Sequence, residues 1–175
     1  MQEHPLALFR YCPVCGSSHF EEHNQKSKQC RDCGFTYYIN PSAATVAFIL
    51  RGSELLVVRR GKEPAKGTLD LPGGFSDLYE TSEEGICREV KEETGLTVRK
   101  TEFLFSIPNR YLYSGLVIHT MDMFYLCQVD DTAEVHAMDD AAEAMWIPLQ
   151  DISPEAFGLD SVRQGVEKFL TNFTI

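Results

Sequence analysis

The chain has 175 residues and a formal net charge of −10, with 43% hydrophobic and 24% charged residues. This length allows one ordinary domain and a small additional unit, and the composition is that of a globular protein rather than a disordered or fibrous one. The acidic balance disfavours extended contact with nucleic acid, and no apolar run is long enough for a membrane helix. Since the first residues also lack the pattern of a signal peptide, we expect a cytoplasmic protein.

The first predicted elements follow a polar, cysteine-bearing block over residues 1–40, which Pro41 separates from the rest of the chain. Apolar segments on either side of the turn at 51–53 predict a β-hairpin. The expected strands of this half lie at residues 43–50, 54–60 and 69–71, with a loop at 61–67 and a turn at Gly73-Gly74. We therefore expect two domains, 1–40 and 41–175.

A helix is predicted between Thr81 and Gly95. Thr81 and Glu84 fit a capping box, in which each residue binds a free backbone N–H of the first turn. Gly95 suits the left-handed C-terminal cap, and the apolar Ile86 and Val90 share one face of the helix.

The rest of the chain predicts a further set of strands and a second helix. The expected elements are strands at 102–107, 116–129 and 144–148, a loop at 108–115 and a helix at 161–172. Strands interrupted by two helices indicate a mixed α/β domain.

The predicted helix carries a cluster of carboxylates. Glu89, Glu92 and Glu93 are spaced i, i+3 and i+4, so they project from one face, where like charges repel. This crowding indicates a bound cation, and Mg²⁺ or Mn²⁺ prefers such oxygen ligands. Arg88 is placed to orient one of the carboxylates. A solvated acidic helix face is the alternative reading of these three glutamates alone.

The wider pattern removes this ambiguity. Gly74, Glu80 and the run Arg88-Glu89-Val90-x-Glu92-Glu93-x-Gly95-Leu96 resemble the signature of the Nudix hydrolase family at every specified position. The resemblance implies an α/β/α sandwich with a mixed sheet, which extends over roughly residues 42–173. It also implies metal-dependent hydrolysis of a phosphoanhydride bond in a nucleoside diphosphate linked to another moiety, and a homodimer is usual in this family.

The same resemblance assigns roles within the predicted site. Glu89 and Glu93 correspond to the principal ligands of Mg²⁺ or Mn²⁺, and Glu92 lies in the same cluster. A backbone carbonyl of Gly73 or Gly74 is expected to complete the coordination, while Arg88 and Glu80 are expected to hold the glutamates in place. Asp140 is the best match for a further acidic ligand, ahead of Asp139 and Glu143. Both Glu89 and Glu92 remain candidates for the general base.

Four of the six cysteines form two Cys-x-x-Cys pairs, each followed by a glycine and separated by fourteen residues. Such pairs can place four thiolates around Zn²⁺ with no open coordination position, which is typical of a structural site. The ligands are Cys12, Cys15, Cys30 and Cys33, and the segment resembles a zinc ribbon. Unrelated redox thiols are the alternative. His4, His19 and His23 are expected not to be ligands, and Cys87 and Cys127 are expected in the core.

A zinc ribbon followed by a Nudix signature is similar to the domain order of NADH pyrophosphatases. Members of that family carry the element Ser-Gln-Pro-Trp-Pro-Phe-Pro shortly after the signature. This chain instead reads Phe-Ser-Ile-Pro-Asn-Arg-Tyr at residues 105–111, and its only tryptophan, Trp146, lies elsewhere. We therefore expect ADP-ribose or a similar nucleotide sugar to be preferred over NADH.

Two groups of residues are candidates for substrate binding. Arg59 and Arg60, with Lys62 and Lys66, follow the second strand toward the predicted site and suit phosphate binding, although a solvated basic loop is an equal alternative. Asn109 and Tyr111 lie in the predicted 108–115 loop, where Tyr111 or Tyr113 is a candidate for stacking on a base.

Three functions therefore remain open from the sequence. The first is hydrolysis of ADP-ribose or a similar nucleotide sugar. The second keeps the chemistry with NAD(H) or a NAD-capped RNA as substrate. The third is a non-catalytic nucleotide sensor on the Nudix scaffold, against which the complete set of acidic signature residues argues. In each case the partner is a small nucleotide or nucleotide end, and binding to a membrane is not expected.

Overall fold

The computed structural model describes residues 4–130, 134–138 and 141–172 of the chain. It divides into two compact units, Met1–Pro41 and Ser42–Ile175. None of the helices in the described residues has the length and apolarity needed to span a bilayer.

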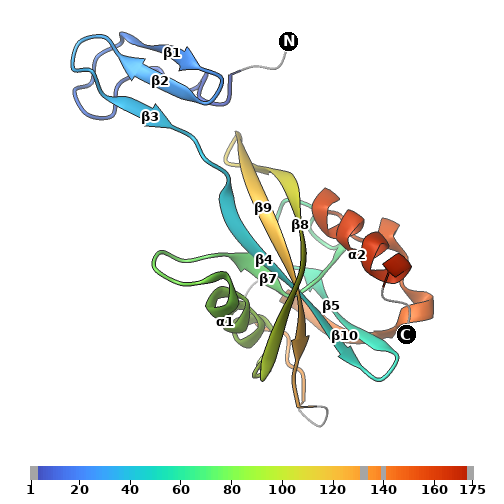
Figure 1. The fold of residues 1–175 in the computed structure, drawn as a ribbon. Helices are drawn as coiled ribbons and strands as arrows, with labels where there is room; N and C mark the ends of the chain where they lie inside the picture. Colours follow the sequence, from blue (N-terminus) through green and yellow to red (C-terminus); the bar gives the residue numbers. More distant parts are fainter. Residues whose placement is uncertain (1–3, 131–133, 139–140, 173–175) are drawn as a thin grey trace. The chain divides into compact units, whose positions relative to one another are not determined.

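The first unit contains three short antiparallel strands in the order β1-β2-β3 (Figure 1). Their bounds are Phe20–Asn24 for β1, Ser27–Cys30 for β2 and Thr36–Tyr38 for β3. Its hydrophobic cluster is small, with Cys12, Phe20 and Cys30 buried and Phe35 packed against them, and Leu6 is buried as well. A core of this size gives little hydrophobic stabilisation.

The second unit is built on a seven-stranded sheet with the central order β10-β5-β4-β9-β8. Among the described strands of this unit, β4 and β9 pair in parallel and the other pairs are antiparallel, so the sheet is mixed, as expected. The strands are β4 (Ser42–Arg51), β5 (Glu54–Arg60), β6 (Leu69–Asp70), β7 (Gly73–Phe75), β8 (Lys100–Tyr113), β9 (Leu116–Gln128) and β10 (Ala141–Pro148).

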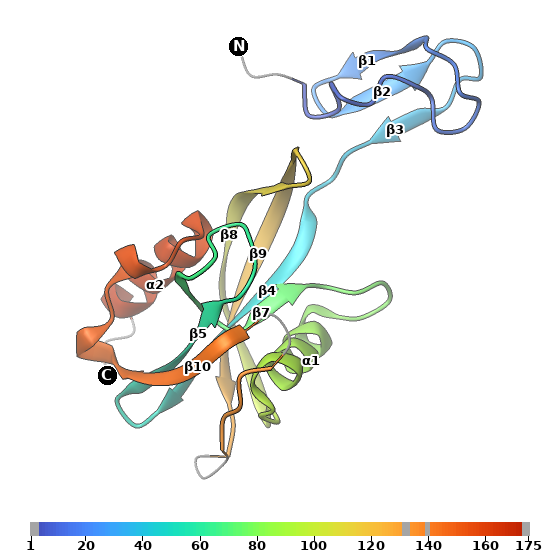
Figure 2. The ribbon, with the colours of Figure 1, turned by 180° about the vertical axis from the view of Figure 1, so that it is seen from behind.

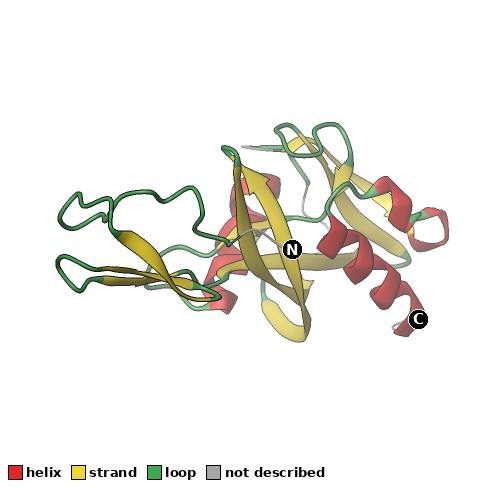
Figure 3. Cartoon of the chain, turned by 90° about the horizontal axis from the view of Figure 1, so that it is seen from above, coloured by secondary structure: helices red, strands yellow, loops and turns green. Residues whose placement is uncertain are grey.

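Two helices, α1 (Ser82–Thr94) and α2 (Asp160–Asn172), cover the two faces of this sheet (Figure 3). The alternation of side chains along β4 explains the two layers. Val46 and Phe48 face α2 in one core cluster, and Ala47 and Ile49 face α1 in the other. The expected α/β/α sandwich is therefore confirmed.

The ends of α1 form as the sequence predicts. The Thr81 hydroxyl accepts a hydrogen bond from the backbone N–H of Glu84 at 3.2 Å, and the Glu84 carboxylate accepts one from the N–H of Thr81 at 2.8 Å. Gly95 ends the helix with φ of 73°. Between these caps, Ile86 and Val90 are buried in the core on the α1 side of the sheet, and Glu93 is buried as well.

The predicted loop at 108–115 is wrong, because β8 continues through Tyr113 and the turn is limited to Ser114-Gly115. Pro108 suggested a loop, but β8 lies at the edge of the sheet, where the missing N–H of proline breaks no ladder bond. The Gly73-Gly74 turn is likewise part of a strand, β7, which pairs with β4.

A split between β4 and β5 creates the space for a site. These strands pair only near their shared turn, at Leu50–Leu55 and Arg51–Glu54. Further along, the segment with β6 and β7 lies between them, β6 pairing with β5 and β7 with β4 (Figure 2). The glycines of β7 are thereby held beside α1, with which this strand is in contact.

Candidate active site

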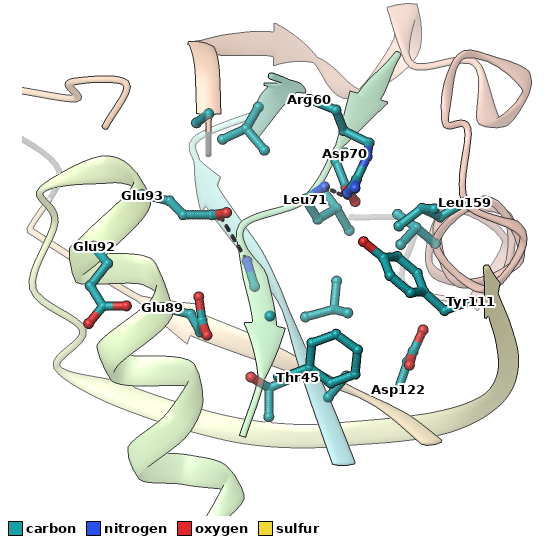
Figure 4. A pocket seen from close by; sticks show the side chains of 18 of the residues that line it. Thr45, Arg60, Asp70, Leu71, Glu89, Glu92, Glu93, Tyr111, Asp122 and Leu159 are labelled. Carbon is teal, nitrogen blue, oxygen red and sulfur yellow. Dashed lines mark hydrogen bonds and ion pairs between the residues drawn. The ribbon is translucent and has the colours of Figure 1, made fainter. Parts of the chain in front are cut away.

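A cavity of about 400 Å³ lies at this split in the sheet. Its walls come from β4, β5, β7 and α1 on one side and from β8, β9 and the start of α2 on the other. Figure 4 shows the carboxylates of α1 on one side of the cavity, with Tyr111, Asp122 and Leu159 opposite them. The cavity thus has an acidic helix on one wall and a mixed polar and apolar wall facing it.

The three glutamates predicted as metal ligands all line this cavity. Glu89 and Glu93 point toward β7, and Glu92 lies further out (Figure 4). The exposed fraction of the side chain is 14% for Glu89 and 47% for Glu92. Glu93 is anchored to β7, because its Oε2 accepts a hydrogen bond from the backbone N–H of Gly73 at 3.1 Å.

Arg88 links the carboxylates of the site into one network. Its guanidinium donates to Glu80 at 2.7 and 3.1 Å, to Glu89 at 2.8 Å and to Glu92 at 3.0 Å. It also donates to the backbone carbonyl of Phe75 at 3.1 Å, which ties α1 to the end of β7. A single arginine therefore offsets the repulsion among three glutamates and fixes their orientation.

Gly74 makes room for Glu89. A Cβ on Gly74 would lie 2.6 Å from Oε1 of Glu89, closer than any ordinary contact. Gly73 is restricted for another reason, since its φ is 154° and a Cβ there would lie 2.1 Å from the carbonyl oxygen of Thr45. Gly73 thus allows the backbone conformation of β7 and its close approach to β4, and Gly74 leaves space for the Glu89 carboxylate.

The surroundings shift the pKa values of two of these carboxyl groups in opposite directions. Burial raises the pKa of Glu89, which Arg88 only partly offsets. Hydrogen bonds from Arg88 and from the backbone N–H of Asp77 lower the pKa of Glu80. Glu89 is thus the more basic of the two, while Glu80 stays ionised as the partner of Arg88.

The residues present fit a divalent cation of the Mg²⁺ or Mn²⁺ type. Three carboxylates line one cavity, and oxygen ligands are those that such ions prefer. Gly74 leaves a gap that admits the Glu89 carboxylate beside the backbone of β7. Glu92, whose side chain is half exposed, can leave Arg88 without unpacking the helix. The acidic wall is therefore suited to bind metal and, through it, phosphate.

The four residues predicted to bind substrate also line the cavity: Arg59, Arg60, Asn109 and Tyr111. Both arginines have protein partners. Arg59 donates to Glu143 and to the carbonyl of Gly67, each at 2.9 Å, and Arg60 donates to Asp70 and to the carbonyl of Pro64. Of the two lysines considered with them, Lys62 lines the cavity and the exposed Lys66 does not.

Two buried aspartates at the cavity were missed by the sequence analysis. Asp70 pairs with Arg60 and accepts a hydrogen bond from the N–H of Leu71 at 2.8 Å; burial raises its pKa, and Arg60 opposes the shift. Asp122 lies on β9 on the same face as the core residue Phe124. A lone carboxylate on the apolar face of a predicted strand was the available signal for Asp122.

The further acidic ligand expected in the last loop cannot be placed. Asp140, the best match, and Asp139 lie outside the described residues. Glu143, the third candidate, forms an ion pair with Arg59. Trp146 is partly buried against the α1-side core and stacks under the guanidinium of Arg51.

The four cysteines of the first unit converge. Sγ atoms lie 3.7 Å apart for Cys12 and Cys33 and 3.6 Å apart for Cys15 and Cys30. A tetrahedral zinc with Zn–S bonds of about 2.3 Å requires sulfur separations of about 3.8 Å. In the described part of the chain, this is the one group of potential ligands whose atoms all lie within 4.8 Å of one another, and it contains no histidine.

The backbone around these cysteines is arranged to support thiolates. The N–H of Gly16 donates to the carbonyl of Cys12, and that of Gly34 to the carbonyl of Cys30, which closes two equivalent turns. Both glycines have left-handed φ values, 74° and 77°. Hydrogen bonds from the backbone N–H groups of Cys33 and Asp32 lower the pKa of Cys30 to about 6. In the metal-free cluster the neighbouring Cys33 thiol and burial raise the pKa of Cys15 to about 12, so the four thiols share their protons unequally. The cluster is therefore compatible with a structural zinc site.

Comparisons with known proteins agree with this geometry. A model of the NUDIX domain matches residues 40–171. The ADP-ribose pyrophosphatase of Methanocaldococcus jannaschii is 32% identical over 130 residues, which are 73% of this chain and 74% of that protein. The NAD-capped RNA hydrolase NudC of Vibrio cholerae is 26% identical over 154 residues, or 87% of this chain and 54% of NudC, so the chain spans about half the length of that relative.

A solved structure extends the similarity to the fold. The crystal structure of a NUDIX hydrolase from Nitrosomonas europaea superposes with a TM-score of 0.72 at 17% identity, covering 93% of this chain and 90% of that one. At this identity the likeness concerns the fold alone.

Proposed function

Because this chain belongs to the Nudix hydrolase family, we propose that it hydrolyses the phosphoanhydride bond of a nucleoside diphosphate linked to a sugar, with ADP-ribose as the representative substrate. The observation that carries the proposal is the gathering of Glu89, Glu92 and Glu93 on one wall of a cavity beside β7. A relative named for ADP-ribose hydrolysis, similar over three quarters of the chain, supports this choice of substrate.

The residues of the site have separable tasks in this reaction. Bound Mg²⁺ or Mn²⁺ would neutralise phosphate charge and lower the pKa of a water molecule. Glu89 and Glu93, held by Gly74 and by the N–H of Gly73, are the proposed ligands, with a carbonyl of β7 completing the set. Arg88 and Glu80 maintain their orientation. Glu89 or Glu92 accepts the proton from the attacking water.

The test is a substrate panel with product analysis. The protein is incubated with Mg²⁺ or Mn²⁺ and with ADP-ribose, ADP-glucose, NADH and nucleoside triphosphates, and nucleotide products are separated by chromatography. We expect AMP and ribose 5-phosphate from ADP-ribose at the highest kcat/KM of the panel. If no substrate is hydrolysed, the chain is a nucleotide sensor and the catalytic proposal is wrong.

A pair of variants on α1 separates a metal ligand from a general charge effect. Glu93→Gln removes one carboxylate from the cavity, whereas Glu83→Gln makes the same change at an exposed position outside the cavity. We expect kcat to fall by about 10³-fold or more in Glu93→Gln and to stay within about twofold in Glu83→Gln. Equal activity of the two variants would remove Glu93 from the site.

A second candidate substrate is a NAD-linked diphosphate. The similarity to proteins named NAD-capped RNA hydrolase, over 87% of this chain in one case, favours it. The sequence at residues 105–111, which lacks the element of NADH pyrophosphatases, argues against it. In the panel, a kcat/KM for NADH above that for ADP-ribose would select this alternative.

For the first unit, we propose one structural Zn²⁺ held by Cys12, Cys15, Cys30 and Cys33, in a zinc ribbon over residues 1–40. The sulfur separations and the glycine turns support this assignment. Elemental analysis of the purified protein should return about one zinc atom per chain. A folded protein free of zinc would contradict the assignment.

A further inference from the structure

Asp122 is a buried carboxylate that the metal chemistry does not use. Its residue is 5% exposed, yet it lines the cavity. Figure 4 shows its side chain on the wall opposite the glutamates of α1, next to Tyr111. Asp122 therefore faces the part of a substrate that lies away from the metal-binding wall.

The hydrogen bonds of Asp122 leave one acceptor position open. Oδ2 accepts from the amide of Asn109 at 3.2 Å and from the hydroxyl of Ser161. Within the described residues, Oδ1 accepts one hydrogen bond, from the hydroxyl of Thr120 at 2.6 Å. An ionised carboxylate offers about four acceptor positions. The fourth acceptor position therefore belongs to Oδ1.

The described hydrogen-bond partners of Asp122 all donate to it. Three donors surround it, and Ser161 is the second residue of α2, so the carboxylate lies at the positive end of that helix. The phosphates of a diphosphate bridge carry acceptors only, so they find no hydrogen-bond partner in this buried acceptor oxygen. It accepts an uncharged hydrogen-bond donor instead.

We propose that Asp122 is a specificity-determining residue, whose Oδ1 accepts a hydrogen bond from the uncharged part of the substrate. The donor is a sugar hydroxyl or the exocyclic amine of a base, since both are neutral donors of the required kind. This inference rests on the proposed function, because it assumes that the diphosphate lies at the acidic wall. The proposed hydrogen bond places the uncharged end of the substrate beside Asn109, Tyr111 and Asp122. A terminal phosphate group does not bind there.

The experiment compares Asp122→Asn with the wild type on ADP-ribose and IDP-ribose. In the base of IDP-ribose a carbonyl oxygen replaces the exocyclic amine, and the adjacent ring nitrogen carries a hydrogen. Asparagine keeps the shape but replaces one acceptor oxygen with an NH2 donor, so we expect KM for ADP-ribose to rise about tenfold with kcat within threefold. The same rise with IDP-ribose identifies a sugar hydroxyl as the donor. A rise confined to ADP-ribose identifies the amine.

Ser161→Ala is the matched control for a structural effect. It removes a buried hydroxyl that donates to Asp122 but keeps the carboxylate. We expect a lower melting temperature and a KM within twofold of the wild type. If Asp122→Asn does not fold, Asp122→Ser replaces it, since a serine hydroxyl can still bond with Thr120.

Two results would overturn the inference. One is a folded Asp122→Asn protein with KM within twofold of the wild type for both substrates. The other is an equal rise of KM in Ser161→Ala, which would make Asp122 a structural residue. If the wild type hydrolyses neither substrate, the proposed function fails by itself. The comparison is then made on the dissociation constant of ADP-ribose, measured by calorimetry.

Discussion

Gly74→Ala isolates the position of a single carboxylate from the stability of the fold. The new Cβ would lie 2.6 Å from Oε1 and 2.7 Å from Oε2 of Glu89, and no backbone atom is among its nearest contacts. To reach an ordinary contact at 3.4 Å, the carboxylate must retreat by about 0.8 Å. A displacement of about 1 Å in a catalytic group can lower the rate by about 10²-fold. We therefore expect kcat for ADP-ribose to fall by about 30- to 100-fold.

The neighbouring Gly73→Ala provides the contrast. Its Cβ would lie 2.1 Å from the carbonyl oxygen of Thr45, and its φ of 154° strains any other residue. We expect its free energy of unfolding to fall by about 2–5 kcal/mol, while that of Gly74→Ala stays within about 1 kcal/mol of the wild type. The assay pairs urea unfolding with steady-state kinetics. A stable Gly74→Ala enzyme with wild-type kcat would refute the role given to Glu89.

The remaining predictions concern stability and zinc. Arg88 lowers the pKa of Glu80 from its ordinary 4.5, so the Arg88–Glu80 pair stabilises the fold above pH 4.5 and this stability is lost as the pH falls through the lowered pKa. Glu80→Gln should therefore be less stable than the wild type at neutral pH but not in acid. If the free energies of unfolding of the two proteins differed equally at every pH, this prediction would be contradicted. Cys30→Ser should lose its zinc by elemental analysis and the dispersed NMR signals of residues 4–41, with those of the second unit retained; a zinc-loaded variant would contradict the ligand assignment. In Gly165→Ala, the new Cβ would lie 2.3 Å from the Phe124 ring. The cost of this clash should exceed the gain in helix propensity and lower the free energy of unfolding by about 1–2 kcal/mol. A more stable variant would refute the packing argument.

The acidic wall of the site was predictable because its geometry is local. Thr81 and Gly95 set the ends of α1, and the helical repeat then places Glu89, Glu92 and Glu93 on one face. The convergence of the four cysteines was similarly accessible, since two short motifs with glycine turns define the cluster. In both cases, residues close in sequence carry most of the geometric information.

The opposite wall depends on contacts between distant segments, which no local pattern reports. Asp122 binds Asn109 on the neighbouring strand and Ser161 at the start of α2, 39 residues away. The strand that carries Asn109 and Tyr111 was mistaken for a loop, because the sequence around Pro108 does not reveal that β8 is an edge strand. Likewise, the pairing of Arg60 with Asp70 follows from the insertion of β6 beside β5.

The binding of Mn²⁺ to the zinc-loaded protein tests the central claim most directly. The loss of the electron paramagnetic resonance signal of free Mn²⁺ is followed during titration of the wild type, Glu93→Gln and Glu83→Gln. We predict that the wild type and Glu83→Gln bind Mn²⁺ alike and that Glu93→Gln binds it at least tenfold more weakly. Identical titration curves for all three proteins would mean that the carboxylates of α1 do not hold the metal.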